Sequence, residues 1–216
     1  MKMVLLGPPG AGKGTLAKGV AAIFGIPHVS TGEMLRAAVK KGGSTAEEAD
    51  RLMKAGQLLP DELILRIVKE RLSQPDCGMG YILDGVPRTV AQARGLEAVG
   101  IAVEIAVLLT VPDEIVVRRM AMRRVCTRCG AGYNLDSMPP RHAGVCDVCG
   151  GPVAARADDL PQTIADRLKV YHYDTEPVTA FYQERGILLT ILSDSTPQKT
   201  LDALCAALAA AQPVGG

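Results

Sequence analysis

A glycine-rich stretch near the start of the chain, GPPGAGKGT at residues 7–15, has the residue types that bind phosphate. It joins an apolar run at residues 3–6 to a helical pattern over residues 16–24. Glycines let consecutive backbone N–H groups converge on an anion, at the positive end of the helix dipole. Lys13 supports this interpretation, because a cation in the first helical turn opposes the dipole unless an anion offsets it. The stretch therefore predicts a phosphate-binding loop rather than an ordinary Gly/Pro turn.

The loop departs from the Walker A motif at one position. Gly7 to Lys13 fits the spacing G-x-x-x-x-G-K, but Gly14 follows where that motif has serine or threonine, and the hydroxyl comes one place later at Thr15. The motif alone therefore does not assign direct magnesium ligation to Thr15.

Four of the six cysteines form two CxxC pairs with the spacing C-x2-C-x16-C-x2-C: Cys126, Cys129, Cys146 and Cys149. Thiolates two residues apart on a tight turn supply adjacent corners of a tetrahedron, so two such turns complete a four-sulfur site for zinc or a similar metal. A pair of disulfides is the alternative. Cys77 and Cys205 lie elsewhere and are expected to be small side chains in or near the core.

The apolar run at residues 81–84 predicts a buried strand that ends in the carboxylate of Asp84. Ligands of open α/β sheets lie beyond the carboxyl ends of the strands, where a carboxylate can act on the magnesium of a nucleotide. Asp84-Gly85 could instead be a hairpin turn. The residues after Arg88 have helical rather than alternating character, which favours the first interpretation and brings Arg88 to the same cleft as the glycine loop.

Several arginines stand on predicted helices, and their spacing alone does not separate binding from solvation. Arg36 and Arg167 are interpreted from periodicity as surface charges. A helix opening at Pro112 is expected to run through Arg119 to Arg123 and Arg124, close to the first cysteine.

The remaining pattern predicts an α/β fold of alternating strands and helices. Strands are expected at residues 3–6, about 25–29, 81–84, 103–109 and 187–192, and helices at 16–24, 30–39, 46–55, 62–74, 90–96, 112–124, 160–185 with a bend near Pro177, and 198–211. The run at 103–109 is almost continuously apolar, as in a parallel sheet covered on both faces.

Composition excludes some classes of protein. The chain has 216 residues, of which 24 are Lys or Arg and 23 are Asp or Glu, so no overall basic field attracts nucleic acid or anionic membrane. Two Phe, five Tyr and no Trp leave few stacking platforms for bases. The apolar run at the start is too short for a signal peptide, and no transmembrane span is seen. A cytoplasmic protein is expected.

Together these stretches resemble adenylate kinase in its long bacterial form with a metal-binding lid. The resemblance covers essentially the whole chain and rests on motifs in a fixed order: GPPGAGKGT at 7–15, STGEMLRAAVKKG at 30–42, DEL at 61–63, YILDGVPRT at 81–89 with Gln92, RR at 123–124, the four cysteines, RADD at 156–159 and DR at 166–167. It implies the P-loop nucleoside monophosphate kinase fold, with a five-stranded parallel sheet flanked by helices. It also implies three parts: a core of residues 1–29, 60–121 and 160–216, an AMP-binding insert at 30–59, and a lid at 122–159.

The resemblance also implies roles for individual residues. ATP would be bound by Gly10, Ala11, Gly12, Lys13, Gly14, Thr15, Arg119 and Arg123, and AMP by Thr31, Arg36, Leu58, Gly85, Arg88, Gln92, Arg156 and Arg167. The catalytic set would be Lys13, Asp84, Arg88, Arg123, Arg156 and Arg167, with Asp84 orienting magnesium through water. These roles replace the surface interpretation of Arg36 and Arg167. Val86 stands where the family commonly has Phe, Asn134 where His is common, and Ala131 where a basic residue often occurs.

The implied activity is reversible transfer of a phosphoryl group between ATP and AMP to give two ADP, with magnesium required and zinc structural. A monomer without nucleic-acid or membrane partners is expected. One rival is another nucleoside monophosphate kinase of the same fold. A zinc-ribbon nucleic-acid-binding protein and a P-loop switch protein with little turnover are rivals from other classes.

Overall fold

A five-stranded parallel sheet forms the centre of the computed structural model, which describes residues 1–42, 44–156 and 158–211. Its strands lie in the order β2 (His28–Ser30), β3 (Tyr81–Asp84), β1 (Lys2–Leu6), β4 (Ile105–Thr110) and β8 (Leu188–Leu192). The register pairs Leu5 with Asp84 and Leu6 with Leu108, so the strands end at one common edge. All five strands expected from the sequence are present.

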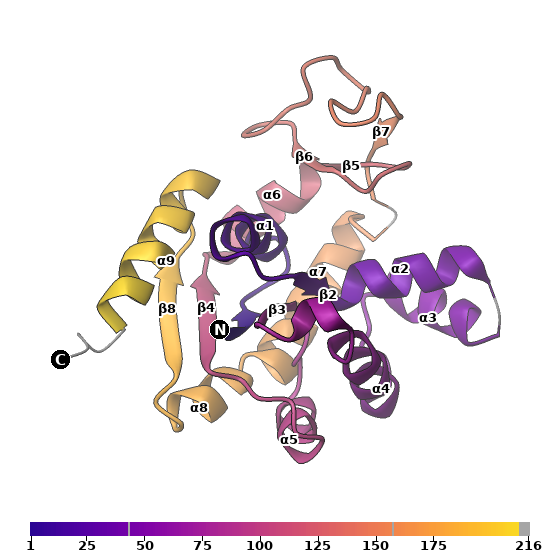
Figure 1. Cartoon of the computed structure of the whole chain (residues 1–216). Coiled ribbons are helices and arrows are strands. Elements are labelled where there is room, and N and C mark those ends of the chain that lie inside the picture. The colour runs from indigo at the N-terminus through magenta and orange to yellow at the C-terminus, as the bar shows by residue number, and fades with distance from the viewer. Residues whose placement is uncertain (43, 157, 212–216) are drawn as a thin grey trace.

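Helices cover both faces of this sheet, which explains why its strands are apolar on both sides. Met3 and Leu5 of β1 face α1 (Lys13–Phe24) and α9 (Pro197–Ala211). Val4 and Leu6 face the opposite side, where α4 (Asp61–Leu72), α5 (Val90–Ala98) and α8 (Val178–Gln183) pack. Figure 1 shows α9 beside β8 at one edge and α4 and α5 beneath the other half of the sheet.

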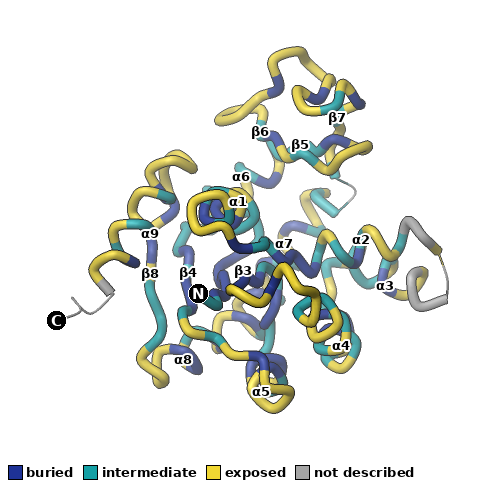
Figure 2. The backbone as a smooth tube through the Cα atoms, in the orientation of Figure 1, coloured by how far each residue is buried: buried dark blue, intermediate teal, exposed yellow. Residues whose placement is uncertain are grey.

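Burial follows this layered arrangement. The inner strands of the parallel sheet are largely buried and dark blue in Figure 2, the edge strand β8 is mostly teal, and the outer helix faces are yellow. Four side chains of β1, Met3, Val4, Leu5 and Leu6, are at most 2% exposed. None of the helices that the structure describes combines the length and the apolar character needed to cross a membrane.

Two helices, α2 (Thr31–Lys41) and α3 (Ser44–Lys54), project from the sheet after β2 (Figure 1). Ser30 caps α2, because its Oγ accepts a hydrogen bond from the N–H of Glu33 at 3.4 Å. The expected helix at 46–55 corresponds to α3, which begins two residues earlier and ends at Lys54. The expected helix at 62–74 corresponds to α4, which ends two residues earlier at Leu72, and a 3₁₀ turn, η1 (Pro75–Cys77), follows it.

The helix expected from Pro112 to Arg124 is shorter than predicted. α6 (Asp113–Ala121) stops before the arginine pair, and Arg123 and Arg124 belong to the strand β5 (Arg123–Cys126). Antiparallel pairing explains the change, because Arg123 lies opposite Asn134 and Arg124 opposite Tyr133. Successive side chains of a strand point to opposite faces, so the two arginines are separated across the sheet rather than spread around a helix.

Strand β5 is the centre of a small antiparallel sheet with β6 (Gly132–Asn134) and β7 (Val153–Ala154). This sheet stands apart from the parallel one, at the top of Figure 1. It belongs to the lid segment, residues 122–159. The buried side chains gathered within it are Cys126, Tyr133 and Cys146.

The long helix expected at 160–185 is divided into three pieces. α7 (Pro161–Val170) continues into a π-helical turn, η2 (Tyr171–Thr175), in which the N–H of Glu176 donates to the carbonyl of Tyr171 at 2.8 Å. α8 starts immediately after Pro177. The interruption expected near this proline is confirmed, and the wider π turn before it is the part that periodicity did not predict.

Candidate active site

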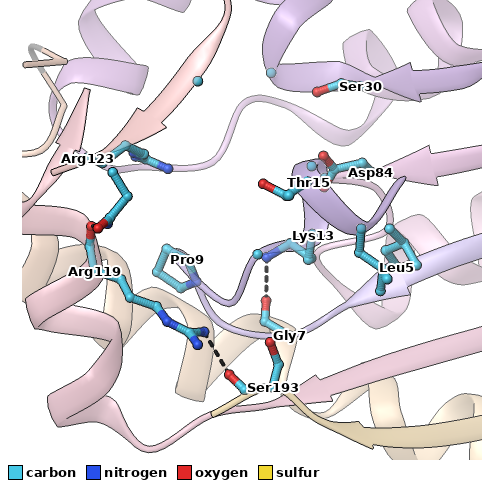
Figure 3. A pocket seen from close by; sticks show the side chains of 18 of the residues that line it. Leu5, Gly7, Pro9, Lys13, Thr15, Ser30, Asp84, Arg119, Arg123 and Ser193 are labelled. Atoms are coloured by element: carbon cyan, nitrogen blue, oxygen red, sulfur yellow. Dashed lines mark hydrogen bonds between the residues drawn. The ribbon is translucent and has the colours of Figure 1, made fainter. Parts of the chain in front are cut away.

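A cleft of about 910 Å³ opens beyond the carboxyl ends of the strands. The glycine loop, α2, α6, α7 and the lid segment all contribute to its walls. Figure 3 shows Lys13 and Asp84 on its floor, with Arg119 and Arg123 approaching from the opposite side. The candidate site therefore lies where open α/β sheets bind ligands.

The glycine loop is fixed by close packing against the sheet. Gly7 has a φ of 132°, and a Cβ at this position would lie 2.5 Å from the carbonyl oxygen of Leu109. Ser193, just beyond β8, donates from Oγ to the carbonyl of Ala11 at 2.9 Å. Ala11 itself is completely buried and can offer the cleft no more than its backbone. Only glycine fits position 7, and the loop is held in one shape.

Lys13 bends back over its own loop. Its Nζ donates to the carbonyl of Gly7 at 2.7 Å (Figure 3) and to that of Pro8 at 2.8 Å. Burial lowers the pKa of Lys13 to about 8, although the charge of Asp84 opposes this shift. An anionic ligand beside the ammonium would favour its charged form, so the site is electrostatically prepared for phosphate.

Asp84 ends β3 beneath the loop, and its Oδ2 lies 3.3 Å from Nε2 of His28 on β2. Burial acts against ionisation of this carboxyl, but the hydrogen bond with His28 and the charges of Lys13 and Arg88 together hold its pKa below the ordinary value. A Cβ on Gly14 would lie 3.4 Å from the same oxygen. The missing side chain at position 14 therefore leaves room beside a charged carboxylate.

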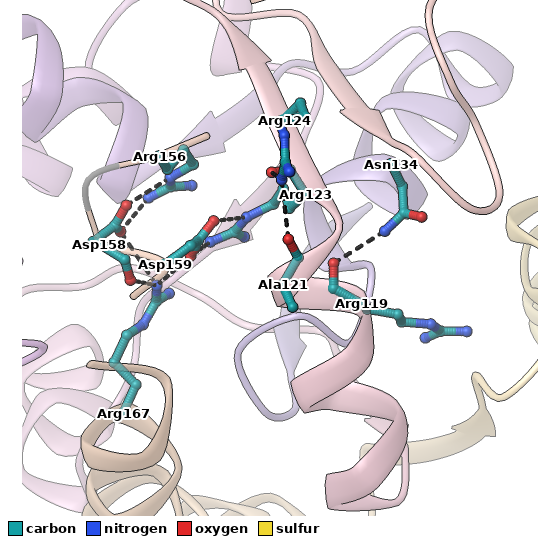
Figure 4. A network of polar contacts seen from close by, with 9 residues as sticks. All are labelled: Arg119, Ala121, Arg123, Arg124, Asn134, Arg156, Asp158, Asp159 and Arg167. Carbon is teal, nitrogen blue, oxygen red and sulfur yellow. Dashed lines mark hydrogen bonds and ion pairs between the residues drawn. The ribbon is translucent and has the colours of Figure 1, made fainter. Parts of the chain in front are cut away.

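Two carboxylates organise the arginines on the lid side (Figure 4). Asp159, whose side chain is 2% exposed, accepts two hydrogen bonds from Arg123, one of them from Nε at 2.6 Å. Asp158 accepts two from Arg156, one of them from Nε at 2.8 Å. Arg167 donates to Asp158 Oδ2 at 3.2 Å and to Asp159 Oδ1 at 3.4 Å. Burial and the neighbouring Arg123 lower the pKa of Arg167 to about 10.

Arg119 is held differently, by backbone carbonyls. Its guanidinium donates to Ser193 O at 2.7 Å and to Ser195 O at 3.0 Å. Asn134 of β6 donates from Nδ2 to the carbonyl of Arg119 at 3.0 Å and so ties the lid segment to the end of α6 (Figure 4). The asparagine that stands where the family commonly has histidine therefore makes a structural contact.

Arg36 and Arg88 also line the cleft, and both extend into a smaller pocket beside it. Nε of Arg88 donates to the carbonyl of Gly85 at 2.9 Å, and burial lowers the pKa of Arg88. A Cβ on Gly85 would lie 2.6 Å from Oγ1 of Thr31, so position 85 requires glycine. Burial, together with the charge of Arg156, lowers the pKa of Arg36 to about 10. Buried cations of this kind are stabilised when an anion enters.

A smaller pocket continues from the cleft between α2 and α5. Thr31, Leu58, Gly85, Arg88 and Gln92 contribute to its lining. Gln92 is 2% exposed, and its side chain bonds to the backbone of Arg88 and to the carboxylate of Asp61. The pocket thus joins an apolar wall to a fixed amide and two nearby guanidiniums.

The four lid cysteines converge at one point, with their sulfur atoms all within 4.8 Å of one another. Sγ of Cys126 lies 3.5 Å from that of Cys149, and Sγ of Cys129 lies 3.6 Å from that of Cys146. These separations are too long for disulfide bonds of about 2.05 Å. They suit a tetrahedral metal, because zinc–sulfur bonds of about 2.3 Å place ligand sulfurs roughly 3.8 Å apart. The four residues could hold a metal ion.

Most residues singled out from the sequence therefore meet in space. The larger cleft is lined by Gly10, Gly12, Lys13, Gly14, Thr15, Arg36, Leu58, Asp84, Gly85, Arg88, Arg119, Arg123, Arg156 and Arg167. Thr31 and Gln92 line the smaller pocket. Ala11 is the exception and lies beneath the loop.

Sequence reasoning assigned no role to the residues that hold these groups in place: His28, Asp61, Asp158, Asp159 and Ser193. The pair Asp158-Asp159 had a usable signal, because two consecutive carboxylates follow Arg156 after a single alanine. His28 and Ser193 become visible only when the parallel strands are aligned.

Comparisons with known proteins agree with this arrangement. The family model described as adenylate kinase matches residues 5–187. A protein named adenylate kinase from Caldicellulosiruptor saccharolyticus is 43% identical over 212 residues, which cover 94% of this chain and 99% of the relative. Proteins of the same name from Archaeoglobus fulgidus and Ruminiclostridium cellulolyticum are each 47% identical, over 88% and 87% of this chain and 90% of each relative.

Proposed function

The chain belongs to the adenylate kinase family, and we propose that it transfers the terminal phosphoryl group of ATP to AMP, reversibly, to give two molecules of ADP. The observation that carries this proposal is the convergence of Lys13, Arg88, Arg123, Arg156 and Arg167 on one cleft. Phosphoryl transfer requires little covalent chemistry from the protein, so positioning and neutralisation of charge supply most of the catalysis.

On one side of the cleft, the loop from Gly10 to Thr15 would hold the phosphates of ATP through its backbone N–H groups. Lys13 would exchange its two carbonyl partners for phosphate oxygens, which offer a full opposite charge. Arg119 would bind ATP from the end of α6, where Ser193 and Ser195 fix its guanidinium.

On the other side, AMP would enter the smaller pocket. Arg36 and Arg88 would bind its phosphate, and Gln92 would meet the edge of its adenine. Thr31, Leu58 and Gly85 complete the walls. Guanidinium groups suit this task because their planar donors can hold phosphate with two parallel hydrogen bonds.

Between the two nucleotides, Arg123, Arg156 and Arg167 would neutralise the charge that spreads over the transferring group. Their present partners, Asp158 and Asp159, hold them together without an anion. A phosphoryl group would compete with these carboxylates for the same donors. The carboxylates thus offset the mutual repulsion of the guanidiniums until substrate arrives.

Two metal ions are part of the proposal. Asp84 fits magnesium, because its carboxylate is charged and the glycine at position 14 leaves space beside it; the ion would neutralise phosphate charge. Cys126, Cys129, Cys146 and Cys149 fit zinc, and four protein ligands leave no position open for water or substrate. We therefore infer a structural role for the zinc.

The division of the chain also remains a proposal: a core of 1–29, 60–121 and 160–216, an AMP-binding insert at 30–59 and a lid at 122–159. The small contact of α2 and α3 with the sheet and the separate three-stranded sheet support it (Figure 1). We further propose a cytoplasmic monomer that interacts with ATP, AMP and ADP rather than with nucleic acid or membrane.

A coupled assay for ADP formation tests the proposed function. Purified protein is supplied with magnesium and ATP, and AMP, GMP, CMP or UMP is added in turn. The expected result is rapid turnover with AMP and much slower turnover with the other three. Turnover that is fastest with another monophosphate would reassign the substrate, and turnover with none would refute the proposed function.

A further inference from the structure

The amide of Gln92 is held at both ends. Its backbone N–H donates to Oγ1 of Thr89, which caps α5, at 2.9 Å. Its side-chain Oε1 accepts from the backbone N–H of Arg88 at 2.8 Å. Its Nε2 donates to Oδ1 of Asp61, in the first turn of α4, at 2.7 Å. Two hydrogen bonds, one with the loop before α5 and one with α4, therefore fix a side chain that is almost completely buried.

These two partners permit one orientation of the amide. A glutamine side chain could exchange its oxygen and nitrogen by a half-turn about its last bond. The backbone N–H of Arg88 can only donate, and a carboxylate at Asp61 can only accept. A turned amide would place its NH₂ group against an N–H and its oxygen against a carboxylate. Asp61 therefore excludes the turned form.

The fixed amide faces the small pocket, whose other walls include the apolar side chains of Leu35, Leu58 and Ile64. Each amide atom keeps one further capacity, a second N–H on Nε2 and a second lone pair on Oε1. We propose that Asp61 is a positioning residue for base selection: by locking Gln92, it presents this donor and acceptor to the base in one order only. The inference rests on the proposed function, because the pocket must receive the base of the monophosphate.

Adenine and hypoxanthine present opposite arrangements of hydrogen-bond donor and acceptor, so they test which arrangement the amide recognises. Adenine offers an acceptor at N1 and an amino donor at C6, whereas hypoxanthine offers an N–H at N1 and a carbonyl at C6. The two bases are otherwise nearly the same size. A base cannot simply turn over, because Arg36 and Arg88 would hold the phosphate to which it is attached. The locked amide would thus accept AMP and reject IMP.

A simpler role must be separated from this one, since the bond from Asp61 to Gln92 also joins α4 to α5. If Asp61 only stabilised this contact, its replacement would lower the melting temperature or slow all monophosphates equally. Asp61→Asn is the informative change, because it preserves the shape while its amide can either donate or accept. Glu62→Gln is the matched control, since Glu62 is an exposed acid in the same helical turn.

The experiment measures kcat/KM for AMP and for IMP with ATP and magnesium, together with melting temperature, in the unchanged protein and in both variants. The unchanged protein and Glu62→Gln should prefer AMP by about a hundredfold or more, because mismatched buried polar groups carry a large penalty. Asp61→Asn should reduce that preference by about tenfold through slower reaction with AMP and faster reaction with IMP.

An unchanged ratio in folded Asp61→Asn would overturn the inference and leave the proposed function intact. A preference for AMP below about tenfold in the unchanged protein would also overturn it, because no selection would then need a locked amide. If Asp61→Asn does not fold, Asp61→Ala carries the same comparison. Absence of ADP formation from AMP in the unchanged protein would instead refute the proposed function.

Discussion

In the five-stranded core, side chains such as Val4 and Leu83 are completely buried between two layers of helices, whereas the lid segment, residues 122–159, encloses little more than Tyr133 and two cysteines. Burial of apolar surface therefore stabilises the core. So small a cluster supplies little to offset the entropy of ordering the lid segment. The proposed metal, held by the four converging thiols, would take the place of a hydrophobic core there.

The same two regions hold most of the site arginines in different ways, although Arg167 of the core shares the two carboxylates of the lid segment. In the core, Arg88 and Arg119 donate to backbone carbonyls, whose positions are set by loops at the ends of strands. In the lid segment, Arg123 and Arg156 donate to the carboxylates of Asp159 and Asp158. Carbonyl partners fix the orientation of a guanidinium group, whereas carboxylate partners neutralise its charge until a phosphate replaces them. The comparison predicts that the core arginines act mainly by their fixed orientation, and that the lid arginines act by exchanging carboxylate partners for phosphate.

Arg88→Lys is the most severe test of the geometric role of the core. A lysine keeps the charge but cannot reproduce two parallel hydrogen bonds to phosphate, so kcat should fall by about 100- to 1,000-fold. The melting temperature should change little. Steady-state kinetics and calorimetry measure both, with Arg94→Lys as a control at an exposed position of α5. Near-normal turnover in Arg88→Lys would remove this residue from the site.

Leu96→Ala tests the claim that burial stabilises the core. Leu96 is completely buried, and the cavity should lower the free energy of unfolding by about 3 kcal/mol and the melting temperature by about 10 °C. Turnover measured well below the transition should be nearly normal. The matched change in the lid segment is Val148→Ala, where the side chain is 75% exposed and an effect near zero is expected. Equal effects at the two positions would contradict the comparison.

Cys146→Ser tests the corresponding claim for the lid segment. The unchanged protein should contain about one zinc per chain, and the variant should lose it and melt on the order of 5 °C lower. At a temperature where it stays folded, the variant should keep a substantial part of its ADP-forming activity. Metal analysis, calorimetry and the coupled assay provide the three measurements.

Cys205→Ser is the control for this change, because Cys205 lies on α9 outside the cluster. It should keep the metal and the melting temperature. If removal of zinc abolished turnover while the lid segment stayed folded and both nucleotides still bound, the metal would have a chemical role and the structural assignment would be wrong.

The core was more predictable from the sequence than the lid segment, for a physical reason. Apolar runs indicated four strands of the parallel sheet, because burial on both faces leaves a continuous apolar run such as residues 105–109, and the short strand β2 was expected from its place after the first helix. The strand at Arg123 and Arg124 was missed, since its partners lie across a hairpin and its residues are charged. Long-range antiparallel pairing decides such a segment, and local propensity does not.

The site residues also differ in how far the sequence predicted them. Spacing alone indicated the glycine loop and the four cysteines, because their chemistry is local in the sequence. The arginines at 36 and 167 were interpreted as surface charges from periodicity, and only a resemblance assigned them to the site. Other contacts join distant segments: Arg119 bonds to Ser193 74 positions away, Arg123 to Asp159 36 positions away, and Gln92 to Asp61 31 positions away. Such partners are fixed by the fold and leave no spacing signal.

The smallest expected effect concerns the two helices that lead into and out of the lid segment. His172 in η2 lies between Asp113 at the start of α6, 3.0 Å from Nε2, and Glu176, 2.9 Å from Nδ1. Hydrogen bonds to Glu176 and Asp113 raise the pKa of His172 above its ordinary value, and the ring of Tyr171 packs edge-on against it. Protonated histidine therefore joins α6 to the π turn.

A histidine whose pKa is raised on folding contributes stability that is present in full below its unfolded pKa of about 6.5 and is lost as the pH rises through the higher folded value. The melting temperature of the unchanged protein should thus exceed that of His172→Gln at pH 5.5, and the difference should shrink as the pH rises above the ordinary histidine pKa of about 6.5. The side chain is 45% exposed, so solvent screening limits the difference to about 1–2 °C. Calorimetry of both proteins across this range measures it, with His142→Gln, an exposed histidine of the lid segment, as the control. If the difference in melting temperature between the two proteins grew with pH, the two carboxylates would not hold a charged histidine. Packing alone would then join α6 and η2.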